Sequence, residues 1–182
     1  MVDEVVVSGV FHKDVQSSLD SLELKTKKDA YIKSKYVKHD LEAIYKTGYF
    51  SSVTAFSLIT NNRHVLSISV KENHSVRSIR VYNLGDFEED LIVSEFEDFK
   101  EKPFNTVSIF EKKEHVVTFL KEKGFDFFEI YRAQFDKQLG QLKIYVGNAV
   151  VEDIVFKGLE GVDPSILVRE MKQKKGSVFN SL

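Results

Sequence analysis

A repeat of about 75 residues is the feature that most constrains what this chain can fold into. Apolar segments ending near a glycine or an asparagine begin at Val5, Ile79 and Ile154, with 74 and 75 positions between successive starts. A second pair of landmarks, Gly48 and Gly124, lies 76 positions apart. Self-similarity at a fixed period is typical of arrays that repeat one supersecondary unit. The sequence therefore predicts consecutive modules of about 75 residues.

The period divides the chain into three stretches. We expect whole modules over residues 1–74 and 75–148, and the start of a third over residues 149–182. The last stretch is shorter than half a period, and so short a segment cannot bury a core of its own. We therefore interpret the chain as a piece of a longer protein.

The composition is that of a globular protein without cysteine chemistry and without a strong net charge. The chain has 182 residues, of which 42% are hydrophobic and 30% charged, with a net charge of −2. This is enough apolar material for packed cores, and no global field steers the protein toward nucleic acid. Cysteine is absent, which excludes disulfides, zinc ribbons, thiol nucleophiles and cysteine-ligated iron–sulfur clusters.

Each full repeat shows the order β-α-α-β-β. In the first, apolar spacing predicts a strand, two helices and two strands at Val5–Phe11, Lys13–Leu22, Ile32–Thr47, Val53–Thr60 and His64–Lys71. The equivalent elements of the second are expected at Val76–Tyr82, Phe87–Phe99, Thr106–Lys123, Phe127–Phe135 and Gln141–Val146. In the third stretch we expect a strand over Val151–Phe156 and a helix that begins at Asp163-Pro164.

Two local patterns indicate how these elements pack and end. Leu66, Ile68 and Val70 alternate with polar residues in the last strand of the first repeat, so one sheet face is buried, by the two helices. Gly48 and Gly124 each follow a predicted helix and precede a large apolar residue. This pattern predicts a positive φ at both glycines, immediately after the helix.

The segment Asp40–Val53 carries a resemblance to a known family. It reads Asp-Leu-Glu-Ala-Ile-Tyr-Lys-Thr-Gly-Tyr-Phe-Ser-Ser-Val and is followed by a strand that ends in Glu72-Asn73. It resembles a POTRA domain, the soluble repeat that precedes the barrel in the BamA family of outer-membrane assembly proteins. The structural positions of the resemblance are Gly9, Gly48, Tyr49, Phe50, Gly124, Phe125 and Gly158.

The resemblance implies an α+β fold of tandem β-α-α-β-β modules. Each would be a three-stranded mixed sheet covered on one face by two helices, with the last strand central and the preceding strand at an edge. That preceding strand shows apolar side chains on both faces, a combination that natural edges avoid and binding edges use. We therefore expect client-binding edge strands at Val53, Thr54, Ala55, Phe56, Ser57 and Leu58, and at Phe127, Phe128, Glu129, Ile130 and Tyr131.

The function implied by the resemblance is a binding scaffold at the periplasmic face of the outer membrane, or its organellar equivalent. Such modules would receive unfolded outer-membrane client proteins by β-augmentation and dock accessory assembly subunits. Membrane attachment would come through a C-terminal barrel missing from this sequence. Two alternatives stay open: substrate-recognition modules of a two-partner secretion channel, and a POTRA-like module of a non-barrel membrane protein.

We expect no catalytic residue, cofactor, metal or nucleic-acid partner. The histidines at positions 12, 39, 64, 74 and 115 lack metal-ligand spacing, and no phosphate loop or nucleophile elbow occurs. The lysine run of residues 25–38, interleaved with Tyr31 and Tyr36, is interpreted as a solvated surface, because a nucleic-acid patch normally carries arginine. The acidic run from Asp86 to Glu101 is interpreted as an ordinary amphipathic helix.

Overall fold

The computed structural model describes residues 1–85, 87–158, 161 and 163–181. The chain divides into two compact units: unit 1, of residues 1–76 and 101–110, and unit 2, of residues 77–100 and 111–182. Asp86 of the acidic run, and parts of the stretch over residues 149–182, lie outside the described residues. The module boundaries that follow from the repeat, after residues 74 and 148, stay a prediction.

Unit 1 contains the element order expected of the first repeat. Its elements are β1 (Glu4–Ser8), α1 (Lys13–Asp20), α2 (Ser34–Lys46), β2 (Phe50–Thr60) and β3 (Arg63–Glu72). The strand order is β1-β3-β2, with β1 parallel and β2 antiparallel to the central β3. A parallel pair needs a long crossover, here supplied by the two helices, whereas β2 and β3 need only a tight turn. Asn61 and Asn62 form that turn, both with positive φ.

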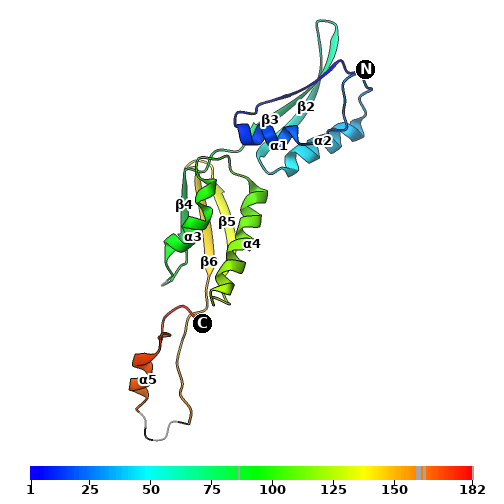
Figure 1. The fold of residues 1–182 in the computed structure, drawn as a ribbon. Helices are drawn as coiled ribbons and strands as arrows, with labels where there is room; N and C mark the ends of the chain where they lie inside the picture. Colours follow the sequence, from blue (N-terminus) through cyan, green and yellow to red (C-terminus); the bar gives the residue numbers. More distant parts are fainter. Residues whose placement is uncertain (86, 159–160, 162, 182) are drawn as a thin grey trace. The chain divides into compact units, whose positions relative to one another are not determined.

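The core of unit 1 lies between the two helices and one face of its sheet (Figure 1). Alternation on β3 turns its apolar residues to the helices, and the apolar stripe of each helix turns to the sheet. The buried cluster consists of Val15 and Leu19 from α1, Ile44 from α2, and Phe50, Ile68 and Val70 from the sheet. Burial of a side chain of this size stabilises the fold by about 1.5–3 kcal/mol.

Unit 2 repeats this arrangement. Its strands are β4 (Ser78–Tyr82), β5 (Glu129–Asp136) and β6 (Gln141–Gly147), in the order β4-β6-β5 with β4 parallel and β5 antiparallel to β6. The helices are α3 (Glu89–Phe96), a 3-10 turn over Glu97–Phe99, and α4 (Thr106–Glu122), whose first residues belong to unit 1. Its buried residues include Ile92, Phe96, Val116, Leu120, Phe128, Leu142 and Ile144.

The predicted fold class is confirmed, and so are both glycine turns. Each sheet is three-stranded and mixed, with its last strand central, and its helices lie on one side (Figure 1). Gly48 has φ 82° and stands two residues after the end of α2, and Gly124 has φ 88° and stands two residues after the end of α4. A residue in this left-handed conformation ends a helix, and glycine adopts it without a side-chain clash.

Three expectations from the sequence were wrong in detail. Residues Val151–Phe156 form no strand. In units 1 and 2 the first strand pairs with the last, and no strand within the described part of residues 149–181 offers such a partner. The helix expected to reach Phe99 ends at Phe96 and tightens into the 3-10 turn. Strand β5 begins at Glu129, so Phe127 and Phe128 precede it.

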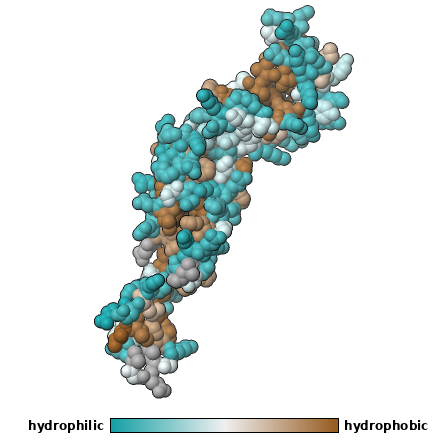
Figure 2. Space-filling model, in the orientation of Figure 1, coloured by the Kyte–Doolittle hydropathy of each residue, from teal (hydrophilic) through white to brown (hydrophobic). Residues whose placement is uncertain are grey.

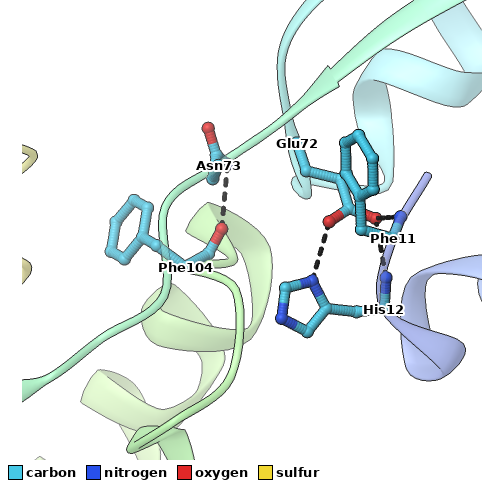
Figure 3. A network of polar contacts seen from close by, with 5 residues as sticks. All are labelled: Phe11, His12, Glu72, Asn73 and Phe104. Carbon is cyan, nitrogen blue, oxygen red and sulfur yellow. Dashed lines mark hydrogen bonds and ion pairs between the residues drawn. The ribbon is translucent and has the colours of Figure 1, made fainter. Parts of the chain in front are cut away.

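A carboxylate fixes the turn between β1 and α1 (Figure 3). Glu72, at the end of β3, accepts hydrogen bonds from the backbone N–H groups of Phe11 and His12 at 2.8 and 3.2 Å, and its other oxygen lies 2.8 Å from His12 Nδ1. The Glu72 side chain is only 5% exposed. Its partners therefore replace the water that a buried carboxylate loses. In unit 2 the chain just after β6 contacts the turn after β4 through an amide, since Asn148 Nδ2 donates to the Leu84 carbonyl at 3.2 Å.

Asp40 on α2 holds the preceding loop. Its carboxylate accepts hydrogen bonds from the backbone N–H groups of Lys25, at 2.8 Å, and Thr26, at 2.7 Å, and the side chain is buried. Burial alone raises the pKa of this carboxyl, but the hydrogen bonds donated by Thr26 and Lys25 outweigh it, and the pKa is lowered overall. The ionised form is thus the one that the fold stabilises.

We expect Asp40→Asn to lower the free energy of unfolding of unit 1 by about 1–3 kcal/mol at pH 7. The substitution replaces one of the two carboxylate oxygens that accept from Lys25 and Thr26 by an NH₂ group, which cannot accept. The pKa of Asp40 is lower in the folded chain than in the unfolded one. The stabilisation of the fold by ionised Asp40 is therefore fully present above pH ~4, and it is lost as the pH falls through the folded-state pKa. Urea denaturation at pH 7 and pH 3 should show the difference between the variant and the parent shrinking at low pH. Glu23→Gln, on the exposed loop, serves as control, and a pH-independent difference would contradict this account.

Gly48 has no room for a side chain, because a Cβ atom there would lie 2.5 Å from Asn105 Oδ1 and 3.0 Å from Val107 N. Gly48→Ala should lower the free energy of unfolding of unit 1 by about 2–4 kcal/mol, from left-handed strain and steric overlap together. Gly85 also has positive φ, but nothing lies within 4 Å of its Cβ position. Gly85→Ala should therefore cost unit 2 only the strain, about 1–2 kcal/mol. Equal losses in thermal and urea melts would show that the overlap relaxes without cost.

Candidate functional site

Strand β2 presents an unpaired edge in unit 1. It pairs along one side with β3, from Phe50 opposite Glu72 to Thr60 opposite Arg63, and in the described part of the chain no strand pairs with its other side. At 11 residues it exceeds the usual strand length, and it extends past the five residues of β1. The edge predicted from the resemblance at residues 53–58 therefore lies within an outer strand.

The direction of the backbone groups on β2 follows from His64 on β3. Its N–H donates to the Asp3 carboxylate at 2.7 Å and its carbonyl accepts from the Asp3 N–H at 2.8 Å, so the His64 backbone faces the β1 side of the sheet. Backbone direction alternates along a strand, so Val65, Ser67 and Ser69 face β2. The residues of β2 opposite them use their N–H and C=O groups in the ladder. The groups that point to the open edge are those of Val53, Ala55, Ser57 and Ile59.

The side chains beside this edge are apolar and exposed. Phe56 and Leu58 lie on the face of the sheet away from the helices and are 53% and 51% exposed, and Ile59 on the other face is 69% exposed. No residue of Phe50–Thr60 carries a charge. Proteins usually blunt an edge with charged residues, bulges or covering segments. Strand β2 lacks charges along its length, and its register shift lies between Phe50 and Ser52, before the exposed stretch. Figure 2 shows, on one face of the molecule, apolar patches separated by hydrophilic surface.

The edge strand of unit 2 is different. Strand β5 has eight residues, of which Glu129, Arg132 and Asp136 are charged. Its register with β6 shifts between Ile130 and Arg132, which leaves Tyr131 as the extra residue of a bulge. A bulge and charges are the features that protect an edge from further pairing.

Of the five residues predicted as a binding edge in the second repeat, the structure brings only some to the surface. Phe128 and Ile130 are buried, at 2% exposure each, and belong to the core. Phe127 precedes the strand, and its ring contacts that of Phe179, with 5.6 Å between the centroids. Only Glu129 and Tyr131 combine a place in β5 with exposure. This part of the predicted site is therefore weaker than the β2 edge.

An aromatic cluster that the sequence reasoning missed covers the helix-free face of the second sheet. Tyr82 and Tyr145 stack with their centroids 5.0 Å apart, Tyr131 lies 6.3 Å from Tyr145, and the Arg132 guanidinium lies over Tyr145. Tyr131 also hydrogen-bonds Asn83. The signal in the sequence was a tyrosine in each of the three strands, but the register that brings them together could not be deduced. These contacts occupy the aromatic rings within unit 2.

The charged runs find partners inside the fold. Lys33 and Lys35 lie over the ring of Tyr36, each about 5.3 Å from its centroid. In the acidic run, Glu95 pairs with Lys112 at 2.9 Å, and Glu89 accepts a hydrogen bond from the Val81 N–H. Among the described residues no group of three or more His, Asp or Glu side chains could hold a metal ion.

No helix in the described part of the chain has both the length and the apolar character needed to span a membrane.

Comparison with known proteins identifies the fold. No protein-family model and no curated protein matches the chain in sequence. Solved structures do match. The N-terminal domain of Omp85 from the cyanobacterium Thermosynechococcus elongatus is 20% identical, with a TM-score of 0.78 over 99% of this chain and 79% of that one.

Two structures from Anabaena agree with this result. POTRA domains 1–2 of the periplasmic domain of its Omp85 are 19% identical, with a TM-score of 0.63 over 84% of this chain and 97% of theirs. POTRA domains 1–3 of the same protein are 20% identical, also with a TM-score of 0.63, over 99% of this chain and 79% of theirs. At these identities the likeness establishes the fold, and the chain has the fold of tandem POTRA domains.

The different burial of two neighbouring phenylalanines gives a test of the corrected site. Phe128→Ala should lower the free energy of unfolding of unit 2 by about 3–5 kcal/mol, because it leaves a cavity in the core. Phe127→Ala removes an exposed ring and should cost less than about 1 kcal/mol. Chemical denaturation followed by the NMR signals of unit 2 residues measures both changes. Losses of similar size would place Phe127 in the core and contradict the structure.

Proposed function

We propose that this chain, with its fold of tandem POTRA domains, is a periplasmic scaffold segment of an Omp85- or BamA-type outer-membrane protein assembly machine. It binds proteins and performs no bond-making chemistry. Its clients are unfolded outer-membrane proteins, and accessory assembly subunits dock on the same modules. The observation that carries the proposal is the uncharged, unpaired and apolar edge of β2.

Strand addition fits the geometry of that edge. An extended client strand placed beside β2 meets the outward N–H and C=O groups of Val53, Ala55, Ser57 and Ile59, which it can bond whatever its sequence. Phe56 and Leu58 add apolar contact on the helix-free face, beside the half-buried Val65. A client with alternating apolar residues gains most, because its apolar side chains then share one face with these two.

The affinity expected of such a site is low. Ordering an unfolded segment costs conformational entropy that offsets much of the gain from backbone pairing, so dissociation constants in the range of about 0.1–2 mM are expected. Weak binding suits a scaffold that passes a client onward and must release it. Within unit 2, the bulged and charged β5 offers less, so we place the principal client site on β2.

The test is a proline substitution at Ser57, whose N–H points to the open edge and takes no part in the β2–β3 ladder. Ser57→Pro removes that donor and puts the proline ring where a client strand would lie. In NMR titrations with a ten-residue peptide of alternating apolar and polar residues, we expect about tenfold weaker binding than in the parent protein. Ser57→Ala keeps the N–H and should bind like the parent.

A further double variant tests the apolar contact separately from the backbone edge. Phe56→Ser with Leu58→Ser leaves the backbone edge intact and should weaken binding by removing apolar contact. Phe56→Pro breaks a ladder bond to β3 and is therefore not informative about the edge. If Ser57→Pro keeps the parent spectrum for α1 and α2 and still binds the peptide equally well, with the same shifts along β2, strand addition at this edge is wrong.

A further inference from the structure

Two asparagines recur at the repeat period beside the two glycine turns. Asn105 and Asn180 lie 75 positions apart, in the triplets Phe104-Asn105-Thr106 and Phe179-Asn180-Ser181. Asn105 belongs to unit 1 and Asn180 to unit 2. The repeat therefore allows the same contact to be compared within each unit separately.

In unit 1 the triplet docks on the end of helix α2. Asn105 Nδ2 donates to the Thr47 carbonyl at 2.9 Å, and the Thr106 N–H donates to the Gly48 carbonyl at 3.3 Å. Asn73 joins the glycine turn to the triplet. Its Nδ2 donates to the Gly48 carbonyl at 3.0 Å and to the Phe104 carbonyl at 2.8 Å, the second of which is drawn in Figure 3. Asn105 is 4% exposed.

In unit 2 the second triplet docks on the end of helix α4 in the same way. Asn180 Nδ2 donates to the Lys123 carbonyl at 3.0 Å, and the Ser181 N–H donates to the Gly124 carbonyl at 2.9 Å. Both pairs of bonds thus join an asparagine amide and the following N–H to the first two carbonyls after a helix. The acceptors are in each case the residue before the glycine and the glycine itself.

The chain that leads into each triplet is held alike. The N–H groups of Val76 and Val151 donate to the carbonyls of Lys102 and Ser177, both at 2.9 Å. The N–H groups of Phe104 and Phe179 donate to the carbonyls of His74 and Ala149, at 3.0 and 2.8 Å. The contact is therefore a property of the repeat and not of one local sequence.

Helix-end chemistry explains why this place accepts donors. The last carbonyls of a helix have no partner inside the helix and carry the negative end of its dipole, so an N–H donor is favoured there. The Asn105 side chain also accepts hydrogen bonds. Its Oδ1 accepts hydrogen bonds from the backbone N–H groups of Val107 and Ser108 at 2.9 and 3.0 Å, and so caps the start of α4. An amide side chain can do both at once, because its oxygen caps one helix while its nitrogen donates to the end of another.

We propose that the glycine turn ending the second helix of each module is a docking site for the Phe-Asn-Thr/Ser triplet of the following repeat, and that Asn105 and Asn180 tie successive repeats together through their amide donors. The partner that fits this surface is the next repeat of the same chain. In the first repeat the residue before the second helix is Lys33, which makes no side-chain cap bond. A lysine side chain can donate to a carbonyl, but it has no acceptor with which to cap a helix.

The test separates the tie from the helix cap. Aspartate caps a helix as well as asparagine but has no N–H to donate. In the whole chain, Asn105→Asp should keep the amides of Val107 and Ser108 protected from hydrogen exchange, while the Thr106 amide exchanges about tenfold faster. Asn105→Ala removes both functions and should accelerate exchange at all three amides. Asn180→Asp should accelerate exchange at Ser181 in the same way.

Asn61→Asp is the matched control, because Asn61 lies in the β2–β3 turn, where aspartate also tolerates a positive φ. It should leave exchange at Thr106 and Ser181 unchanged. If Asn105→Asp exchanges at Thr106 like the parent protein, the amide donor does not hold the triplet and the proposal is wrong. If Val107 and Ser108 accelerate together with Thr106 in that variant, the tie and the cap are not separate functions of the Asn105 side chain, and the proposal is equally overturned.

Discussion

The central strand of each sheet is the constraint on which the rest of the structure depends. Strand β3 must satisfy backbone groups on both sides while it buries the alternate side chains Leu66, Ile68 and Val70. A parallel strand on one side and an antiparallel strand on the other meet that requirement, and the two helices form the crossover that the parallel partner needs. A sheet of three strands then has two outer strands, each paired along one side only. The unpaired edge is thus a direct product of the architecture.

The two units treat that edge differently. Unit 1 leaves the long strand β2 uncharged, with Phe56 and Leu58 beside it. Both outer strands have a register shift, before Ser52 in β2 and at Tyr131 in β5, but unit 2 also shortens its strand and places three charges along it, while its tyrosines contact one another on the sheet face. The same architecture thus gives an open, uncharged edge in one copy and a shorter, charged edge in the other. The proposed client site rests on this contrast, because the shared fold alone does not distinguish the two strands.

The sequence predicted those parts of the fold that depend on local pattern. Period and alternation located every strand and helix of the two full repeats, and the helix-end pattern identified both glycine turns, since each of these signals lies within a few residues. Pairing over long distances was less accessible. Residues Val151–Phe156 have the composition of a strand, but a strand needs a partner. Phe127 and Phe128 look alike in the sequence. Only the packing within unit 2 shows that the Phe128 ring is buried and the Phe127 ring exposed.

The candidate site was predictable as a strand but not as a surface. The apolar residues on both faces of 53–58 indicated an edge, whereas the identity of the outward N–H groups required the contact between His64 and Asp3. Asn105 and Asn180 recur at the repeat period in matching Phe-Asn-Thr/Ser triplets, but the sequence does not show what their amide groups contact. Their role becomes visible only when the same hydrogen bonds occur twice, at helix ends whose side chains differ.

The helix-end contact also bears on how an array of such repeats can arise. Its acceptors are main-chain carbonyls, and the residues that supply them, Thr47 in one repeat and Lys123 in the other, differ in size and charge while accepting the same bond. A duplicated copy of one repeat inherits a compatible acceptor at once, and later substitution of those side chains does not erase it. The surfaces of successive copies are then free to diverge toward different partners without loss of the helix-end contact.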